Sequence, residues 1–115
     1  MDGSFNYMRG IPIYCISIGL WKGYEPVLGV VYDLVQNDIY HGIVREGAYK
    51  NNEQISVSKV TSFSDAVLCT GFPVNYNYSR NKIIIFANKV QKFKKIRLLG
   101  SAAISLSFVA SGVVD

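Results

Sequence analysis

Three adjacent residues near the start of the sequence, Asp2, Gly3 and Ser4, combine a carboxylate, a glycine and a hydroxyl. A carboxylate can bind a hard cation such as Mg²⁺, and residues that open a helix direct free backbone N–H groups toward an anion. The tripeptide therefore permits a site at which magnesium and phosphate meet. Asp-Gly is also a common turn, so the surrounding sequence has to decide between the two interpretations.

The other reactive side chains lack partners in the sequence. His41 is the single histidine and lies in an expected hairpin, and no histidine lies near the C-terminal serines, so a serine hydrolase is not supported. Cys15 and Cys69 lie in apolar, strand-like surroundings, which favours reduced core thiols over a disulfide or a zinc site. None of these residues predicts a catalytic centre.

The elements that must position these residues begin with a sheet. Residues 11–21 are rich in Ile, Tyr and Cys and predict a largely buried strand. A strand at 27–35 and a hairpin over 39–49 continue it as an antiparallel meander. We also expect a short edge strand at 55–58 and a central strand at 66–72, ended by Pro73.

The last third of the sequence predicts two helices. Residues 79–93 place apolar side chains at three- and four-residue spacing with lysines between them, which indicates an amphipathic helix capped by Ser79 or Asn77. A brief strand over 95–99 then leads into a helix over 102–112 whose small residues allow close packing on a sheet.

The composition is that of one small folded domain. Half of the 115 residues are hydrophobic and 17% are charged, which excludes a disordered chain. The mean hydropathy of +0.19 is high for so short a chain and predicts apolar faces that further protein covers. No apolar run approaches the ~20 residues that cross a bilayer, and Asp2 stands where a signal peptide has basic residues. We therefore expect a cytoplasmic protein with no membrane partner.

Charge adds one further expectation. The net charge is +4, and residues 88–97 hold the densest basic cluster. A nucleic-acid surface, a solvated helix face and a site for phosphorylated small molecules are three interpretations of such a cluster. No aromatic platform or recognised nucleic-acid motif accompanies the lysines, so we expect no nucleic-acid partner.

Longer strings decide the interpretation of the opening residues. The strings DGSFNYMRGIPIYCISIGLW, GVVYD, GAYKN, ISVS, CTGFP and GSAAISLSFVASGVVD occur in this order. Together they resemble the inositol monophosphatase family, above all its archaeal branch, whose members also act on fructose 1,6-bisphosphate. The opening resembles the end of D-P-[IL]-D-G-[ST]-x-N-[FY], and residues 100–103 resemble G-[ST]-A-A.

The resemblance implies an α/β (α+β) fold, the layered αβαβα sandwich of the sugar phosphatases, with an antiparallel meander sheet. Residues 1–115 would form a single incomplete domain, the central part of that fold. By the same resemblance, Asp2 and the backbone carbonyl of Met1 bind catalytic Mg²⁺. The N–H groups of Gly3 and Ser4 bind phosphate, and the Ser4 hydroxyl helps to orient the attacking water.

The resemblance also assigns residues beyond the opening motif. Gly100, Ser101 and Ala102 match a loop that contacts the substrate's hydroxyl groups, and Arg97 precedes that loop, where its charge could reach a second phosphate. Asn6 and Tyr7 match the end of the opening motif, where the expected role is structural. Tyr76 and Tyr78 lie where archaeal relatives place substrate-phosphate contacts, with loop packing as the other interpretation.

Three acidic metal ligands of the family have no counterpart here: an upstream Glu, the first Asp of D-P-x-D and the Asp of a W-D motif. Trp21 does not supply the last, because Lys22 follows it. One carboxylate gives too little charge to hold Mg²⁺ strongly. Spacing favours none of the remaining candidate acids, which are Asp33, Asp38, Asp65 and Asp115.

Two hypotheses follow. The first is a Mg-dependent phosphomonoesterase of inositol phosphate or fructose 1,6-bisphosphate type, present as a partial chain that is inactive in isolation and forms a homodimer or oligomer. An internal methionine taken for a start codon would place Met1 directly before Asp2. The alternative is a non-catalytic binding or assembly module derived from the same fold. Whether the chain by itself is an enzyme is left open.

Overall fold

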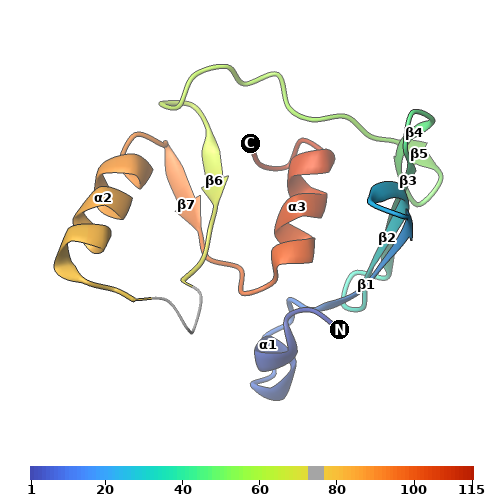
Figure 1. The fold of residues 1–115 in the computed structure, drawn as a ribbon, viewed down its shortest axis with the longest axis horizontal. Helices are drawn as coiled ribbons and strands as arrows, with labels where there is room; N and C mark the ends of the chain where they lie inside the picture. The colour runs from blue at the N-terminus through green and yellow to red at the C-terminus, as the bar shows by residue number, and fades with distance from the viewer. Residues whose placement is uncertain (73–76) are drawn as a thin grey trace.

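Helices and sheets alternate in layers across the molecule. The structure is a computed structural model, and it describes residues 1–72 and 77–115. Figure 1 shows helix α2 (Arg80–Val90), a two-stranded sheet, helix α3 (Ala102–Ala110) and a five-stranded sheet following one another. A short helix, α1 (Ser4–Met8), lies beside the end of the larger sheet. The expected α+β class is confirmed, with four successive layers in the described part of the chain.

The larger sheet is the predicted antiparallel meander, with its strands in sequence order. Its strands are β1 (Cys15–Lys22), β2 (Glu25–Asp33), β3 (Asp38–Ile43), β4 (Gly47–Lys50) and β5 (Glu53–Gln54). A one-residue register shift between Leu20 and Trp21 gives the β1–β2 pair a bulge near its turn. The short connections between these strands explain why local sequence patterns identified them.

Two predictions about this sheet are wrong. The first strand begins at Cys15 rather than residue 11, because Pro12 has no N–H to contribute to a ladder, and of its residues only Cys15 is buried. The expected edge strand over 55–58 is absent, and the edge is instead the two-residue β5. Only the start of this segment contacts the sheet, where the Ile55 N–H donates to the Ala48 carbonyl of β4 at 2.9 Å, and Ser58 donates instead to the C-terminal residue Asp115.

The smaller sheet consists of two parallel strands, β6 (Val67–Cys69) and β7 (Lys95–Arg97), which α2 connects. The predicted strand over 66–72 therefore exists, but it is shorter and belongs to this second sheet. Ser79 occupies the N-cap position of α2 without a side-chain capping bond. The predictions for Pro73 and Tyr76 concern residues outside the described ranges.

The buried core is small for a chain of this length. Among the described residues, the buried hydrophobic side chains are Cys15, Tyr40, Ala66, Ile104 and Val114. The accessible surface is 8625 Å², whereas a compact domain of this mass exposes about 6300 Å². The radius of gyration is 15.6 Å, against about 13 Å for a compact domain of this length. The layers are thus formed but incompletely covered.

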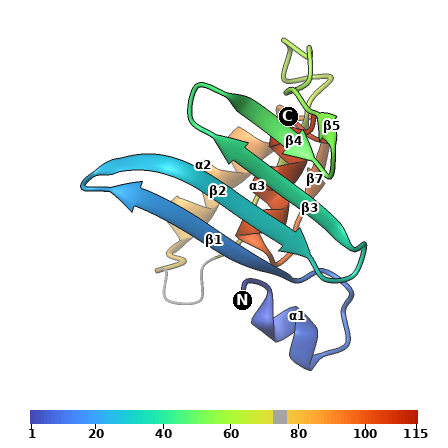
Figure 2. The same cartoon turned by 90° about the vertical axis from the view of Figure 1, so that its right-hand side faces the viewer.

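The five-stranded sheet leaves one face open. Side chains alternate across a strand, and Cys15 lies on the side of α3, so Ile16, Ile18 and Leu20 point away from that helix. These three side chains are 41%, 61% and 52% exposed. In Figure 2, where this face is turned to the viewer, the helices α2 and α3 lie behind the sheet. None of the helices in the described part of the chain combines the length and apolarity that a bilayer crossing requires.

Candidate functional site

The structure brings the first residues of the chain against the start of α3. Asp2 is held by two backbone hydrogen bonds with Cys15, of 2.9 and 3.0 Å. Its Oδ2 accepts a 2.5 Å hydrogen bond from the Ser101 hydroxyl and a 2.9 Å bond from the backbone N–H of Ala103. Two segments that the sequence analysis singled out separately, around residues 2–4 and 100–102, therefore meet at one carboxylate.

The surroundings of Asp2 keep its carboxylate charged. Partial burial raises its pKa, but the hydrogen bond from Ser101 and the backbone N–H groups of Ala103, Gly3 and Ala102 outweigh burial, and the net shift is downward. The positive end of the α3 dipole lies at the same place and favours a negative charge. An ionised carboxylate is the form that can bind a cation.

Gly3 forms a turn that other residues would strain. Its φ is +78°, and a Cβ on it would lie 2.6 Å from the carbonyl oxygen of Ile13, which no side chain tolerates. Ser4 follows as the exposed first residue of α1. N–H groups in the first turn of a helix have no intrahelical acceptor, and this is the kind of group that binds phosphate.

Ser101 has a structural role in addition to any substrate contact. It is buried and caps α3, with its Oγ accepting a hydrogen bond from the Ile104 N–H at 3.2 Å while donating to Asp2. Its hydroxyl is thereby committed to two protein groups. Gly100, which precedes it with φ +72°, and Ala102, which follows it, are both exposed. The loop can therefore offer backbone groups and Ala102 to a ligand more readily than the serine hydroxyl.

The other two predicted residues lie at the margin of this arrangement. Met1 is 64% exposed. Arg97 ends β7, and its Nη1 donates to the neighbouring carbonyl of Ile96 at 3.1 Å. The structure thus gathers Asp2, Gly3, Ser4 and the 100–102 loop, while the Arg97 side chain hydrogen-bonds locally.

A hollow of about 460 Å³ lies beside the Asp2–Ser101 contact. It opens where β6 and β7 end and α3 begins, the edge of a parallel sheet at which ligands generally bind. The sequence analysis missed Thr70, Phe72 and Ser105 in its lining. A parallel pairing of strands 67–69 and 95–97 would have indicated this edge, but such a pairing between distant segments has no local sequence signal. The complete lining is Cys69, Thr70, Gly71, Phe72, Gly100, Ser101, Ala102, Ser105 and Leu106.

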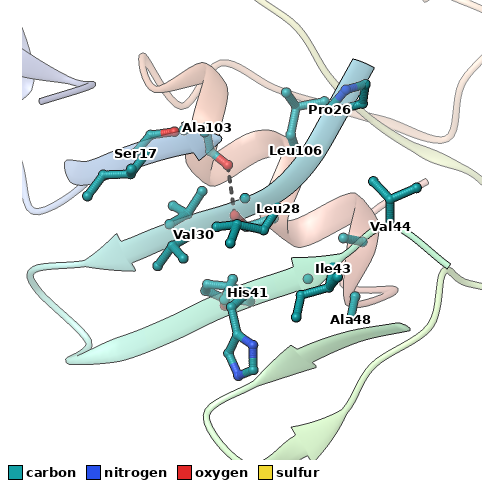
Figure 3. Close-up of a pocket in the computed structure, with 18 of the residues that line it drawn as sticks. Ser17, Pro26, Leu28, Val30, His41, Ile43, Val44, Ala48, Ala103 and Leu106 are labelled. Carbon is teal, nitrogen blue, oxygen red and sulfur yellow. Dashed lines mark hydrogen bonds between the residues drawn. The ribbon is translucent and has the colours of Figure 1, made fainter. Parts of the chain in front are cut away.

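A larger groove, about 550 Å³ in volume, lies between the five-stranded sheet and α3 and is a weaker candidate for a phosphate site. It is lined mainly by apolar residues and glycines, and Figure 3 shows Ala103 and Leu106 on the α3 side of it. His41 borders the groove, but its ring lies on the opposite face of the sheet, because His41 pairs with Val30 and Val30 with Ile18. There the ring stacks on Tyr49 with 5.4 Å between ring centroids. None of its lining residues in the described part of the chain is Asp, Glu, Lys or Arg, so the groove offers neither a carboxylate for a metal ion nor a cation for a phosphate.

The described residues do not by themselves form a magnesium site. Among residues 1–72 and 77–115, no group of three or more His, Cys, Asp or Glu side chains could hold a metal ion. Each remaining candidate acid bonds other protein groups instead. Asp33 accepts from the N–H groups of Val35 and Gln36, and Asp38 pairs with Lys50. Asp65 accepts from Ser62, and Asp115 accepts from Ser58 and from the Val67 N–H. Asp2 is thus a single carboxylate, which would need further ligands to hold Mg²⁺.

Comparison with known proteins places the chain in a family. The sequence model of the inositol monophosphatase family matches residues 1–115. A fructose-1,6-bisphosphatase/inositol-1-monophosphatase of Thermococcus kodakarensis is 34% identical over 115 residues, which are all of this chain and 41% of that protein. A protein of the same description from Aquifex aeolicus is 37% identical over 119 residues, covering all of this chain and 44% of that protein.

Solved structures agree with the sequence comparisons. The inositol monophosphatase of Anabaena superposes with a TM-score of 0.91 at 35% identity, covering 99% of this chain and 47% of that one. The suhB protein of Bartonella henselae gives 0.90 at 30% identity, covering 99% and 44%. The chain spans somewhat over two fifths of the length of the curated relatives it matches. On this evidence, the chain belongs to the inositol monophosphatase family.

Proposed function

We propose that this chain is the central part of a Mg²⁺-dependent phosphomonoesterase that acts on inositol phosphates or fructose 1,6-bisphosphate in the cytoplasm. One observation carries the proposal: the charged carboxylate of Asp2, followed by the Gly3 turn, is held against the first turn of α3. Family membership gives this arrangement its chemical context. The partner is a phosphorylated small molecule, and we propose no nucleic-acid or membrane partner.

In this proposal each residue of the site has a separate task. Asp2 and the carbonyl of Met1 are metal ligands, and the N–H groups of Gly3 and Ser4 bind the phosphate. The Ser4 hydroxyl, which is exposed, helps to orient the attacking water. Magnesium, when bound, supplies positive charge for the phosphate oxygens and lowers the pKa of a bound water.

The substrate is proposed to lie in the hollow beside Ser101. Gly100, Ser101 and Ala102 form one wall and contact the hydroxyl groups of the sugar or inositol. Arg97 would have to turn from the Ile96 carbonyl to reach a second phosphate, a movement that its exposed position allows.

Further polypeptide is needed to complete the metal site. The accessible surface exceeds that of a compact domain by about 2300 Å², and the relatives are more than twice as long as this chain. We propose that residues outside this sequence supply the missing carboxylates. We also propose that they form the fifth layer of the αβαβα sandwich and cover the open sheet face. If the flanking gene sequence encodes no in-frame Glu and no D-P pair before Met1, the truncation hypothesis fails.

The decisive experiment compares two proteins. The 115-residue chain and the protein expressed with its flanking sequence are assayed for phosphate release from inositol 1-phosphate and fructose 1,6-bisphosphate with Mg²⁺. We expect turnover from the longer protein and none from the chain alone. Asp2→Asn in the longer protein should abolish turnover, and Asp65→Asn, at an exposed position away from the site, should not. Robust turnover by the chain alone, or an active Asp2→Asn variant, would contradict the proposal.

One observation favours a second candidate function, a non-catalytic assembly module. The open sheet face carries the exposed side chains of Ile16, Ile18, Leu20, Ile39 and Ile43, and such a face favours association with a second copy. Sedimentation of the chain distinguishes the candidates. Self-association that Ile18→Glu abolishes and Val57→Glu leaves intact would support assembly through this face, whereas a stable monomer argues against it.

A further inference from the structure

Asn6 lies between the two loops that form the proposed site. It is only 7% exposed. Its side-chain nitrogen, Nδ2, donates one hydrogen bond to the carbonyl oxygen of Ile13 and a second to that of Leu99, each of 2.8 Å. One acceptor is 7 residues away in sequence and the other 93. A single side chain thus joins the segment before β1 to the loop before α3.

The chemistry of these bonds requires an amide. Both acceptors are carbonyl oxygens, which only accept, and the NH₂ group of Asn is a nitrogen that carries two hydrogens to give. An aspartate at this position would place oxygens against two carbonyl oxygens and lose both bonds. A glutamine would keep both hydrogens but extend them by one methylene group.

The loops on either side are fitted closely to this amide. A Cβ on Gly100 would lie 2.9 Å from both Nδ2 and Oδ1 of Asn6, so the Gly100 backbone rests directly on the amide group. The Ile13 carbonyl that accepts from Asn6 is also the atom that a Cβ on Gly3 would approach to 2.6 Å. Gly100 therefore lies directly against the Asn6 amide, and Gly3 lies against a carbonyl oxygen to which that amide donates.

We propose that Asn6 is a positioning residue that sets the spacing between the Asp2–Ser4 segment and the Gly100–Ala102 loop. Its two side-chain hydrogen bonds go to Ile13 and Leu99, and it acts by holding the Leu99–Gly100 backbone where Ser101 and Ala103 can reach the Asp2 carboxylate. The link to catalysis rests on the proposed function, while the positioning itself is a property of the chain.

Hydrogen exchange measured by NMR on the 115-residue chain tests the positioning. The reporter is the backbone amide of Ala103, which donates to Asp2, and the internal reference is the amide of Val31 in the five-stranded sheet. In Asn6→Ala we expect the Ala103 amide to exchange about tenfold to a hundredfold faster, because two hydrogen bonds that hold the loop are lost. Val31 should exchange as before, which a general loss of stability would not allow. Asn52→Ala, at an exposed position, is the matched control and should change neither amide.

A second variant covers the case in which Asn6→Ala unfolds. Asn6→Gln retains both donor hydrogens but lengthens the side chain, and it should also speed exchange at Ala103 and not at Val31. In the unmodified chain, NMR couplings across the hydrogen bonds should join Asn6 Nδ2 to the carbonyl carbons of Ile13 and Leu99. Unchanged exchange at Ala103 in both variants, or absence of these couplings, would overturn the proposal.

An activity measurement tests the link to catalysis separately. In the protein expressed with its flanking sequence, Asn6→Ala should lower kcat about tenfold to a hundredfold, because misplacing catalytic groups by a fraction of an ångström slows the reaction. KM should change less than kcat, and Asn52→Ala should change neither. If that protein releases no phosphate at all, the proposed function fails while the exchange measurement still decides the role of Asn6. If it is active and Asn6→Ala leaves kcat unchanged, the catalytic part of the inference is wrong.

Discussion

The Ser101 hydroxyl donates a 2.5 Å hydrogen bond to Oδ2 of Asp2, although 99 positions separate the two residues in sequence. The same hydroxyl oxygen accepts the N–H of Ile104 and so caps α3. The carboxylate and the helix cap are therefore one hydrogen-bonded unit. Replacing Ser101 should therefore change both the stability of α3 and the pKa of Asp2.

Ser101→Ala should destabilise the chain by about 1–2 kcal/mol, because it removes the cap of α3 and one hydrogen bond to a charged carboxylate. Urea denaturation followed by circular dichroism measures the change. Ser111→Ala is the matched control, since the Ser111 hydroxyl bonds only carbonyl oxygens at the opposite end of the same helix. Equal losses in the two variants would show that the Ser101–Asp2 unit adds nothing to stability.

Gly3→Ala should be more destabilising than Gly10→Ala. Both glycines have left-handed backbones, with φ of +78° and +71°, so each substitution bears the same conformational penalty of about 1–2 kcal/mol. A Cβ on Gly10 meets nothing within 4 Å, whereas one on Gly3 lies 2.6 Å from a backbone carbonyl. The difference between the two unfolding free energies isolates the close approach at Gly3, and a difference near zero would contradict it.

The pH dependence of stability should include a contribution from the ion pair of Lys50 and Asp38, whose charged atoms are 2.7 Å apart. Hydrogen bonds from Lys50 and Asn51 hold the pKa of Asp38 below its ordinary value. A lowered pKa means that the stabilisation is present above the unfolded-state pKa near 4 and is lost as the pH falls through the folded-state pKa.

Lys50→Gln should therefore raise the pKa of Asp38, as measured by NMR titration, and flatten the acid limb of the stability curve. The pair is partly exposed, so the effect at neutral pH should stay under about 1 kcal/mol. Lys59→Gln removes the same charge from an exposed residue in the 55–60 segment and should leave the Asp38 titration unchanged. An identical titration in both variants would mean that the pair is not formed in solution.

The sequence predicted the parts of this fold that are local. The meander over 15–50 was identified because its strands are joined by short turns, and the helix of residues 80–90 by its spacing of apolar residues. The burial of the first strand was misjudged because an apolar run such as Ile16–Leu20 is the same whether or not another layer covers it. In the described part of the chain, Ile16, Ile18 and Leu20 are exposed.

The candidate site likewise combines residues that local motifs predicted with contacts that no local pattern could predict. Asp2, Gly3 and Ser4 were found because they form one continuous motif, and the 100–102 loop because it resembles another. The contact between them, and the hydrogen bond from Asn6 to Leu99, join residues that are 99 and 93 positions apart in sequence. No periodicity or local propensity in a single sequence carries that information.

Magnesium should leave the thermal stability of the 115-residue chain unchanged. A ligand stabilises a protein only where it binds the folded state at the concentration used, and among the described residues Asp2 belongs to no group of three or more His, Cys, Asp or Glu side chains that could hold a metal ion. Differential scanning fluorimetry measures the Tm with and without Mg²⁺, both for the chain and for the protein expressed with its flanking sequence. We expect a rise in Tm only in the longer protein, and we expect Asp2→Asn to remove it while Asp65→Asn does not. A rise in Tm of the chain alone that depends on Asp2 would show that the chain contains a sufficient set of metal ligands, and the proposal that further carboxylates complete the site would be wrong.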